Sequence, residues 1–485
     1  MLHHDGNRMV TGGNAAASIE DMNGKIGMNR PGREGQENSM ESGGRLEKAG
    51  TRLRLMLRAL SSRNYRLFFA GQSVSLVGTW MQQVAMSWLV YRLTGSALLL
   101  GVVGFVSQIP TFFLAPVAGV LADRWRRRPL LLATQTLAMA QAAVLAVFVL
   151  TGTTPVWLIV ALSALLGVVN AFDIPIRQSF VVELVEKKED LGNAIALNSS
   201  MVNGARLIGP SIAGVLVATL GEGICFLINA TSYLAVIIAI AAMRLKPVPR
   251  RPGRKHILHE LREGFGYAFD FKPIRYILML LGLVSLMGMP YVVLMPIFAR
   301  EVLHGGAHTF GFLMASVGIG AFCSTLYLAS RTSVIGLGRV IAVAACVFGF
   351  GIAGFALSSS LVLSPLFLAL AGFGAMAQIA SSNTILQTIV DDDKRGRVMS
   401  FFTMSFMGAT PIGSLMAGVV ANRIGAQNTL LIGGVACLLG GALFGRELRN
   451  LRPLIRPIYA RLGIIPEVAA GMQTATDLTS PPEDP

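Results

Sequence analysis

Twelve apolar stretches of 18 or more residues follow one another along this chain of 485 residues. About 20 apolar residues cross the hydrocarbon core of a bilayer as a helix, so twelve spans require roughly 240 positions. The composition supplies them, because 53% of the residues are hydrophobic and only 14% are charged, against roughly 25% charged in a soluble domain. The pattern excludes a soluble enzyme and predicts an all-α membrane protein with twelve transmembrane helices. The expected spans are 66–90, 97–121, 130–151, 156–176, 193–219, 224–243, 275–299, 309–330, 339–358, 361–382, 398–421 and 427–446.

The net charge of +15 is distributed in a way that orients these spans. If both termini lie inside, the inner connections carry 21 of the 41 Lys and Arg residues, and the outer connections carry three, Arg92, Arg300 and Arg423. This asymmetry follows the positive-inside rule. We therefore expect a multi-pass protein of a cytoplasmic membrane with both termini in the cytoplasm. The basic excess reflects topology, so nucleic acid is not an expected partner.

The chain also repeats itself. Val74-Ser75-Leu76-x-Gly78 recurs at an offset of 210 residues, and so does Gly95-x-Ala97-x3-Gly101. Gly209-x4-Gly214-x6-Gly221 recurs at an offset of 204 as Gly413-x4-Gly418-x6-Gly425. Three matches in order predict two pseudo-symmetric halves of six helices, a transporter design in which the substrate site lies between the halves near the midplane. The halves are expected at 61–243 and 274–446.

Polar segments surround these halves. We expect a disordered cytoplasmic tail over 1–60, a cytoplasmic loop over 244–273 and a cytoplasmic C-terminal tail over 447–485. The four cysteines are scattered through apolar spans, which predicts small buried hydrophobes and neither disulfides nor a metal site. The chain has no G-x4-G-K-[ST] motif for a nucleotide and no visible catalytic set, so we expect no cofactor and no enzyme.

The loop after the second span contains Gly119-x-Leu121-x-Asp123-Arg124-x-Arg126-Arg127-Arg128. This stretch resembles the signature of the major facilitator superfamily, although Arg126 stands where the family usually has glycine. The resemblance implies a conformational latch formed by Gly119, Asp123, Arg124, Arg127 and Arg128. A simple topological anchor is the alternative, but it would leave Asp123 without a role.

Further segments are similar to the enterobactin-exporter-like (transmembrane secretion effector) branch of that superfamily, which includes macrolide-efflux relatives. They include Asn64-Tyr65-Arg66-x-Phe68, Phe172-Asp173-x-Pro175-x-Arg177 and Arg395-Gly396-Arg397. This resemblance implies a twelve-helix secondary exporter in a bacterial inner (cytoplasmic) membrane. Gly209-Pro210-x3-Gly214 is similar to the family's antiporter motif, and a tolerated helix kink is the alternative interpretation. We assign Gly209, Pro210, Gly214, Arg395 and Arg397 to the gate together with the latch. Ser163 stands where drug–proton antiporters often carry an arginine, so their coupling chemistry does not transfer directly.

Arg206 lies near the middle of the span expected at 193–219. An arginine there costs roughly 2.5–3.5 kcal/mol on insertion scales, so such residues tend to be functional and paired. Its guanidinium could bind an anionic or catechol-bearing cargo, or brace the fold through helix carbonyls and Asp173. Other polar residues in the spans could line the same cavity or form hydrogen bonds between helices. They are Gln72, Gln82, Gln83, Gln108, Asn198, Asn203, Gln378 and Asn383.

Asp173 is the acidic residue expected inside a span, near the inner end of the fourth helix. It could pair locally with Arg177, which is the favoured interpretation, or take up a proton when the pathway faces inward. Asp173 and Arg177 are therefore the candidates for coupling.

The leading hypothesis is a secondary active exporter of small amphipathic molecules, siderophore- or drug-like, working by proton-coupled alternating access. Its expected partners are a small-molecule substrate, protons and the lipid bilayer, and a monomer is expected. Uptake by proton symport is the alternative within this class. A non-transporting scaffold or secretion accessory is a second alternative, but it would not need polar residues at the midplane.

Overall fold

The computed structural model describes residues 57–124, 126–185, 187–244, 269–331, 333–462 and 464, and the regular elements in these residues are helices. The first 56 residues, most of the predicted central loop and residues 465–485 lie outside this description. Eleven of the described helical segments are long and apolar enough to cross a membrane. The first long helix, α2, has 32 residues and comes in addition to these eleven segments.

The first six long helices are α2 (Arg63–Thr94), α3 (Ala97–Arg124), α4 (Arg127–Leu150), α5 (Val156–Leu184), α6 (Leu191–Leu220) and α7 (Glu222–Ala242). Short 3-10 helices η1 (Arg58–Ser61) and η2 (Lys188–Asp190) precede α2 and α6. The end where α2 meets α3 and α6 meets α7 is called the outer end below, following the orientation expected from charge. The opposite end is called the inner end.

The last six helices include two that are interrupted. The seventh runs through α9 (Lys272–Leu283), η3 (Val284–Gly288), α10 (Tyr291–Ile297) and η4 (Phe298–Val302). The eleventh runs through α14 (Asp392–Thr403), η5 (Met404–Gly408) and α15 (Ala409–Ile424). The uninterrupted ones are α11 (Ala307–Ala329), α12 (Leu337–Leu357), α13 (Leu363–Ile389) and α16 (Ala426–Arg461).

The interruptions are π-helical turns with a proline nearby: Pro296 comes two residues before η4, and the other two turns each precede a proline. Pro290 comes two residues after η3, and Pro411 comes three residues after η5. Proline has no amide proton for the helical ladder, so the neighbouring turns rearrange their hydrogen bonds. Apolar length alone predicted two continuous spans here, at 275–299 and 398–421.

Two glycines of the repeat form the same tight corner in each half. Gly221 connects α6 to α7 with φ 84° and ψ 170°, and Gly425 connects α15 to α16 with φ 86° and ψ 158°. This backbone region is open essentially to glycine alone. The repeated glycine therefore has a conformational cause at both positions.

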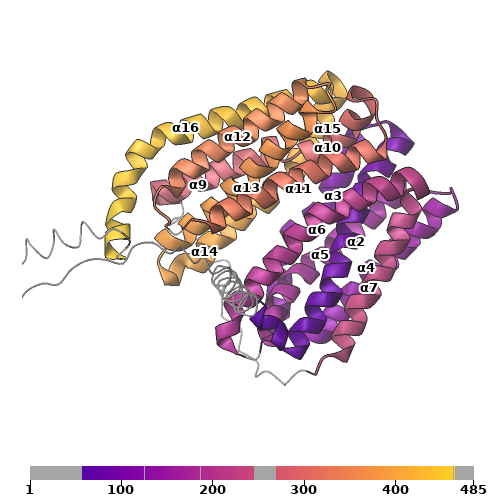
Figure 1. Cartoon of the computed structure of the whole chain (residues 1–485), viewed down its shortest axis with the longest axis horizontal. Coiled ribbons are helices and arrows are strands. Elements are labelled where there is room, and N and C mark those ends of the chain that lie inside the picture. The colour runs from indigo at the N-terminus through magenta and orange to yellow at the C-terminus, as the bar shows by residue number, and fades with distance from the viewer. Residues whose placement is uncertain are drawn as a thin grey trace, which may run out of the picture. The chain divides into compact units, whose positions relative to one another are not determined.

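The helices pack mainly within the first six and within the last six. In the first group α2 packs on α6 and α7, α3 packs on α5, and α4 packs on α5 and α7. In the second group α12 packs on α13 and α16, and α11 packs on α13. Figure 1 shows the indigo-to-pink and the orange-to-yellow helices as these two groups. The main contacts between the groups join α6 to α11 and α3 to α15.

Large apolar side chains are exposed along the helices, as in Trp157 (69%), Phe113 (66%) and Leu357 (71%). A water-soluble monomer does not spread so much exposed apolar surface over its whole length. The packing and the exposed surface fit an all-helical protein whose surroundings are lipid.

Candidate functional site

Four glycines of the sequence repeat hold the two groups of helices together at the outer end. A Cβ atom added to Gly214 of α6 would lie 2.8 Å from the Cα of Gly311 in α11, and one added to Gly101 of α3 would lie 2.9 Å from the Cα of Gly418 in α15. Such distances leave no room for any side chain, so the backbones touch. The offsets of 210 and 204 residues relate one pair to the other, and the contact is therefore made twice by equivalent residues.

The stretch from Gly209 to Gly214 has a packing role on two sides of α6. A Cβ at Gly209 would lie 2.6 Å from the Cβ of Trp80, so this glycine lets α6 approach α2. The carbonyl oxygen of Pro210 lies 2.9 Å from the place that a Cβ at Gly311 would take. The predicted antiporter motif thus lies against both α2 of its own half and α11 of the other half.

Two side-chain contacts add to the closed outer end. The phenol of Tyr91 in α2 donates a hydrogen bond to the carboxylate of Glu301 in η4. Trp88 of α2 stacks on Phe310 of α11, with ring centroids 6.2 Å apart. Tyr91 and Glu301 are themselves 210 residues apart, the offset of the repeat. These four contacts between the halves lie on the same side of the predicted midplane.

Arg206 lies near the middle of α6, as expected, and is half-buried. Its guanidinium carbon lies 5.0 Å from the centroid of the Trp80 ring, a cation–π distance. The Nε atom is buried and has no hydrogen-bond partner. A positive charge with an unused donor thus lies where α6 packs on α2.

Asp173 does not pair with Arg206. Its Oδ1 accepts hydrogen bonds from the hydroxyl of Thr134 at 2.9 Å and from Nε2 of Gln135 at 2.7 Å. Its Oδ2 lies 3.6 Å from Nε of Arg177, one helical turn away. The carboxylate is therefore held between α4 and α5, and the bracing of Arg206 through Asp173 is absent from the described part of the chain.

Gln82 belongs to a network that joins three helices of the first half. Its Nε2 donates to Oε1 of Gln141 in α4 at 3.0 Å, and its Oε1 accepts from Nδ2 of Asn229 in α7 at 2.7 Å. The three side chains are buried. In this structure Gln82 forms the hydrogen bonds between helices that were the alternative to lining a cavity.

The other predicted cavity residues fall into two sets. Gln72 and Gln378 are buried, and Oε1 of Gln72 and both amide atoms of Gln378 have no hydrogen-bond partner. Buried polar atoms without a protein partner are uncommon, so these amide groups can accept or donate further hydrogen bonds. The second set is more accessible or bonded locally: Gln83 is exposed, Asn198 and Asn203 are half-buried, Nε2 of Gln108 donates to Gly104, and Oδ1 of Asn383 accepts from Gln387.

The latch residues lie at the inner end. Gly119, Asp123 and Arg124 belong to the last turns of α3, and the structure does not describe their side chains. Arg127 donates to Glu183 at 2.6 Å and to the carbonyl of Ser179 at 3.1 Å. Arg128 donates to the carbonyl of Ala241 at 2.7 Å. The basic run thus ties the start of α4 to α5 and α7. Arg395 and Arg397 lie in the first turns of α14.

A family model described as a transmembrane secretion effector matches residues 56–452. The chain belongs to this family of the major facilitator superfamily. It is 27% identical to a staphyloferrin A transporter of Staphylococcus aureus, over 77% of this chain and 93% of that protein. It is 23% identical to macrolide efflux protein A of Streptococcus pyogenes, over 80% of this chain and 98% of that protein.

The fold is also that of a solved transporter structure. The solved structure of PepTSo, a transporter of the POT family, superposes with a TM-score of 0.63 at 15% identity and covers 81% of this chain and 98% of that one. The family membership confirms the resemblance found in the sequence motifs. This member is a secondary transporter and not an enzyme.

Several residues of this transporter were not singled out from the sequence. Trp80 stacks on Arg206, and Tyr91 with Glu301 joins the halves at the outer end. The repeat could have indicated Tyr91 and Glu301, since these two residues are themselves 210 positions apart, which is the offset of the repeat. Stacking of Trp80 on Arg206 has no comparable signal, because it depends on how closely Gly209 lets α6 approach α2.

Proposed function

We propose that this transporter exports small amphipathic molecules, siderophore- or drug-like, by proton-coupled alternating access. The observation that carries the proposal is the guanidinium of Arg206, which is stacked on Trp80 and has no acidic partner among the described residues. A fixed cation in a membrane interior requires a compensating group, and an anionic cargo would supply it. Relatives named for staphyloferrin A and for macrolide efflux support the substrate class.

The chemistry around Arg206 favours cargo that combines an anionic oxygen with an apolar ring or chain. The planar guanidinium offers a fork of N–H donors to a carboxylate or catecholate. The indole of Trp80 supports an apolar ring next to that charge. Gln72 and Gln378 carry buried amide atoms without partners, and we assign them to the same cargo path.

The closed outer end supports a cycle in which the cargo site communicates with the cytoplasm in the state described here. For export, the contacts between Gly214 and Gly311 and between Gly101 and Gly418 must separate while the inner end closes. A bound ligand moves such an equilibrium by its difference in affinity between the two states. The small glycine interfaces suit this movement, because they pack closely without interlocking side chains.

Asp173 and Arg177 are our candidates for coupling to the proton gradient. The carboxylate lies near the inner end and is held by Thr134 and Gln135. Protonation would remove its negative charge and weaken its attraction for Arg177, 3.6 Å away. Because α4 and α5 share this network, a change there would alter how they pack. The latch at the end of α3 would then limit how far the two halves can close at the inner end.

The direction of transport can be tested in inside-out membrane vesicles. We expect a proton gradient, acidic inside, to drive labelled carboxylate siderophore or macrolide into vesicles that contain the transporter. Movement in the opposite direction under the same gradient would identify symport uptake. A gradient-independent signal equal to that of empty vesicles, with both probe classes, would contradict the proposal. The control is empty vesicles that lack the transporter and contain the same total amount of membrane protein.

A further inference from the structure

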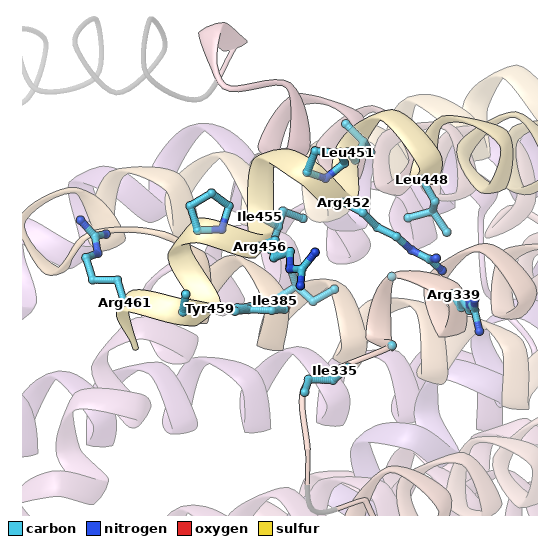
Figure 2. A pocket seen from close by; sticks show the side chains of 15 residues that line it. Ile335, Arg339, Ile385, Leu448, Leu451, Arg452, Ile455, Arg456, Tyr459 and Arg461 are labelled. Carbon is cyan, nitrogen blue, oxygen red and sulfur yellow. The ribbon is translucent and has the colours of Figure 1, made fainter. Parts of the chain in front are cut away.

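A pocket with a volume of about 1180 Å³ lies at the inner end of the second half, away from Arg206. The start of α12 with its preceding loop, the end of α13 and the last turns of α16 form its walls. Figure 2 shows the labelled side chains of α16 along one side, with Arg339 and Ile335 facing them. We call this space the α16 pocket.

The α16 pocket exists because α16 continues past the predicted end of its span. The span was expected to stop at residue 446, but α16 runs to Arg461. Leu448, Leu451, Ile455 and Tyr459 recur every three or four residues, so they share one face of the helix. Leu448 and Leu451 are 9% and 2% exposed, and Ile385 of α13, at 2%, lines the same pocket. The floor is therefore apolar.

The rim is strongly basic. Arg339, Arg452, Arg456 and Arg461 line the pocket, and all four are exposed. Arg461 has a carboxylate partner, Asp391, at 3.1 Å. The structure gives the other three guanidinium groups neither an ion pair nor a hydrogen bond within the described part of the chain. Three positive charges thus surround an apolar floor without a charged partner among the described residues.

Location and chemistry together indicate the occupant. The pocket is formed by three helices at the inner end, where the predicted span of α16 stops at residue 446, and we therefore expect it near the lipid headgroups. Basic pockets between helices on the cytoplasmic side are typical binding sites for anionic headgroups. A free phosphate would occupy a small part of the volume and leave the apolar floor in contact with water. A molecule with an anionic head and acyl chains satisfies both surfaces.

We propose that the α16 pocket binds an anionic phospholipid of the inner leaflet. The phosphate binds Arg339, Arg452 and Arg456, and the acyl chains lie along Ile385, Leu448 and Leu451. This site is separate from the cargo site, so the proposal stands independently of the transport direction. Bound lipid would neutralise the three arginines and connect α16 to the loop before α12.

The test uses the purified full chain in detergent and measures lipid binding by native mass spectrometry. The probes are phosphatidylglycerol and phosphatidylcholine with identical acyl chains. We expect phosphatidylglycerol to bind at least about tenfold more tightly, and each of the substitutions Arg339→Gln, Arg452→Gln and Arg456→Gln to weaken it about fivefold. The matched control is Arg449→Gln, because Arg449 is exposed on the same helix but does not line the pocket.

A triple variant combines Arg339→Gln, Arg452→Gln and Arg456→Gln. If this triple variant does not fold, the three single variants still test the proposal. Equal affinity for the two lipids, or unchanged binding in a folded triple variant, would overturn it. A third arm adds inorganic phosphate to the phosphatidylglycerol complex. Release of the lipid at equal concentrations of phosphate would identify a site for the free ion and would also overturn the lipid assignment. An equal loss of binding in the Arg449→Gln control would show that general charge, and not this pocket, attracts the lipid.

Discussion

Arg206 combines features that are rarely found together at one residue of a membrane helix. It carries a positive charge near the middle of α6, stacks on Trp80 and keeps a buried Nε atom without a partner. The sequence predicted the position and the cost of this charge but left open whether Asp173 would compensate it. The structure answers that point, because Asp173 is engaged by α4 and by Arg177.

We expect Arg206→Ala to reduce export at least about tenfold while the amount of protein in the membrane stays unchanged. The loss follows from removing a charge-assisted contact, which is worth roughly 1.5–3 kcal/mol. Arg206→Lys should retain part of the activity, because the charge remains but the planar fork is lost. Cargo export and immunoblots of the same membranes provide the measurement. Disappearance of the Arg206→Ala protein from the membrane would instead indicate a bracing role.

At Asp173 we expect a change in coupling. Asp173→Asn keeps the hydrogen-bonding size of the side chain but cannot lose a proton. It should abolish cargo movement driven by a proton gradient and leave cargo exchange without a gradient within about twofold of wild type. Vesicle assays with and without a gradient separate the two activities. Equal gradient-driven transport in Asp173→Asn and wild type would exclude this carboxylate as the coupling group.

At the scale of the helices, the repeated glycines explain how the halves meet. The offsets in the sequence identified these four glycines as equivalent residues of the two halves. They could not show that Gly214 contacts Gly311 and that Gly101 contacts Gly418, since those contacts depend on which helices become neighbours. The π-turns of the seventh and eleventh helices were not predicted either. The length of an apolar stretch contains no information about how the backbone hydrogen bonds of the helix are arranged. Pro290 and Pro411 are present in the sequence, but they do not by themselves predict a π-turn.

Substitution of these glycines tests the outer closure. Gly214→Leu should disfavour the closed outer end by about 1–3 kcal/mol through overpacking, which corresponds to roughly a 5–150-fold change in the equilibrium between states. Export measured in cells should fall by a similar factor. The matched control is Gly204→Leu on the same helix, because a Cβ at Gly204 meets nothing within 4 Å. Equal export by the two variants would contradict a gating role for the Gly214 contact.

At the scale of the whole molecule, the count of apolar stretches and the family membership agree on a helical membrane transporter. The inner and outer ends were assigned from the distribution of lysine and arginine, which acts through insertion and leaves no trace in packing. The extension of α16 to Arg461 was missed for a related reason. Its arginines end the apolar run, while Leu448, Leu451 and Ile455 continue the helical period.

Single cysteines can test the orientation in a background with all four native cysteines replaced by alanine. Thr153→Cys lies in the exposed connection between α4 and α5, at the outer end, and Ser333→Cys lies in the exposed connection before α12, at the inner end. We expect a membrane-impermeant maleimide to label Thr153→Cys in intact cells and Ser333→Cys only after permeabilisation. The reverse pattern would invert the topology.

The most direct test of export is a comparison of the small molecules released by cells with and without the transporter. The source strain with its chromosomal copy deleted is complemented with wild type or with Arg206→Ala, expressed at equal levels, and culture media and cell extracts are profiled by mass spectrometry. We predict an amphipathic compound that wild type releases into the medium and that deletion or Arg206→Ala retains in the cells, with a difference of at least about tenfold. Identical media and extracts from all three strains, under iron limitation and under drug challenge, would contradict the account.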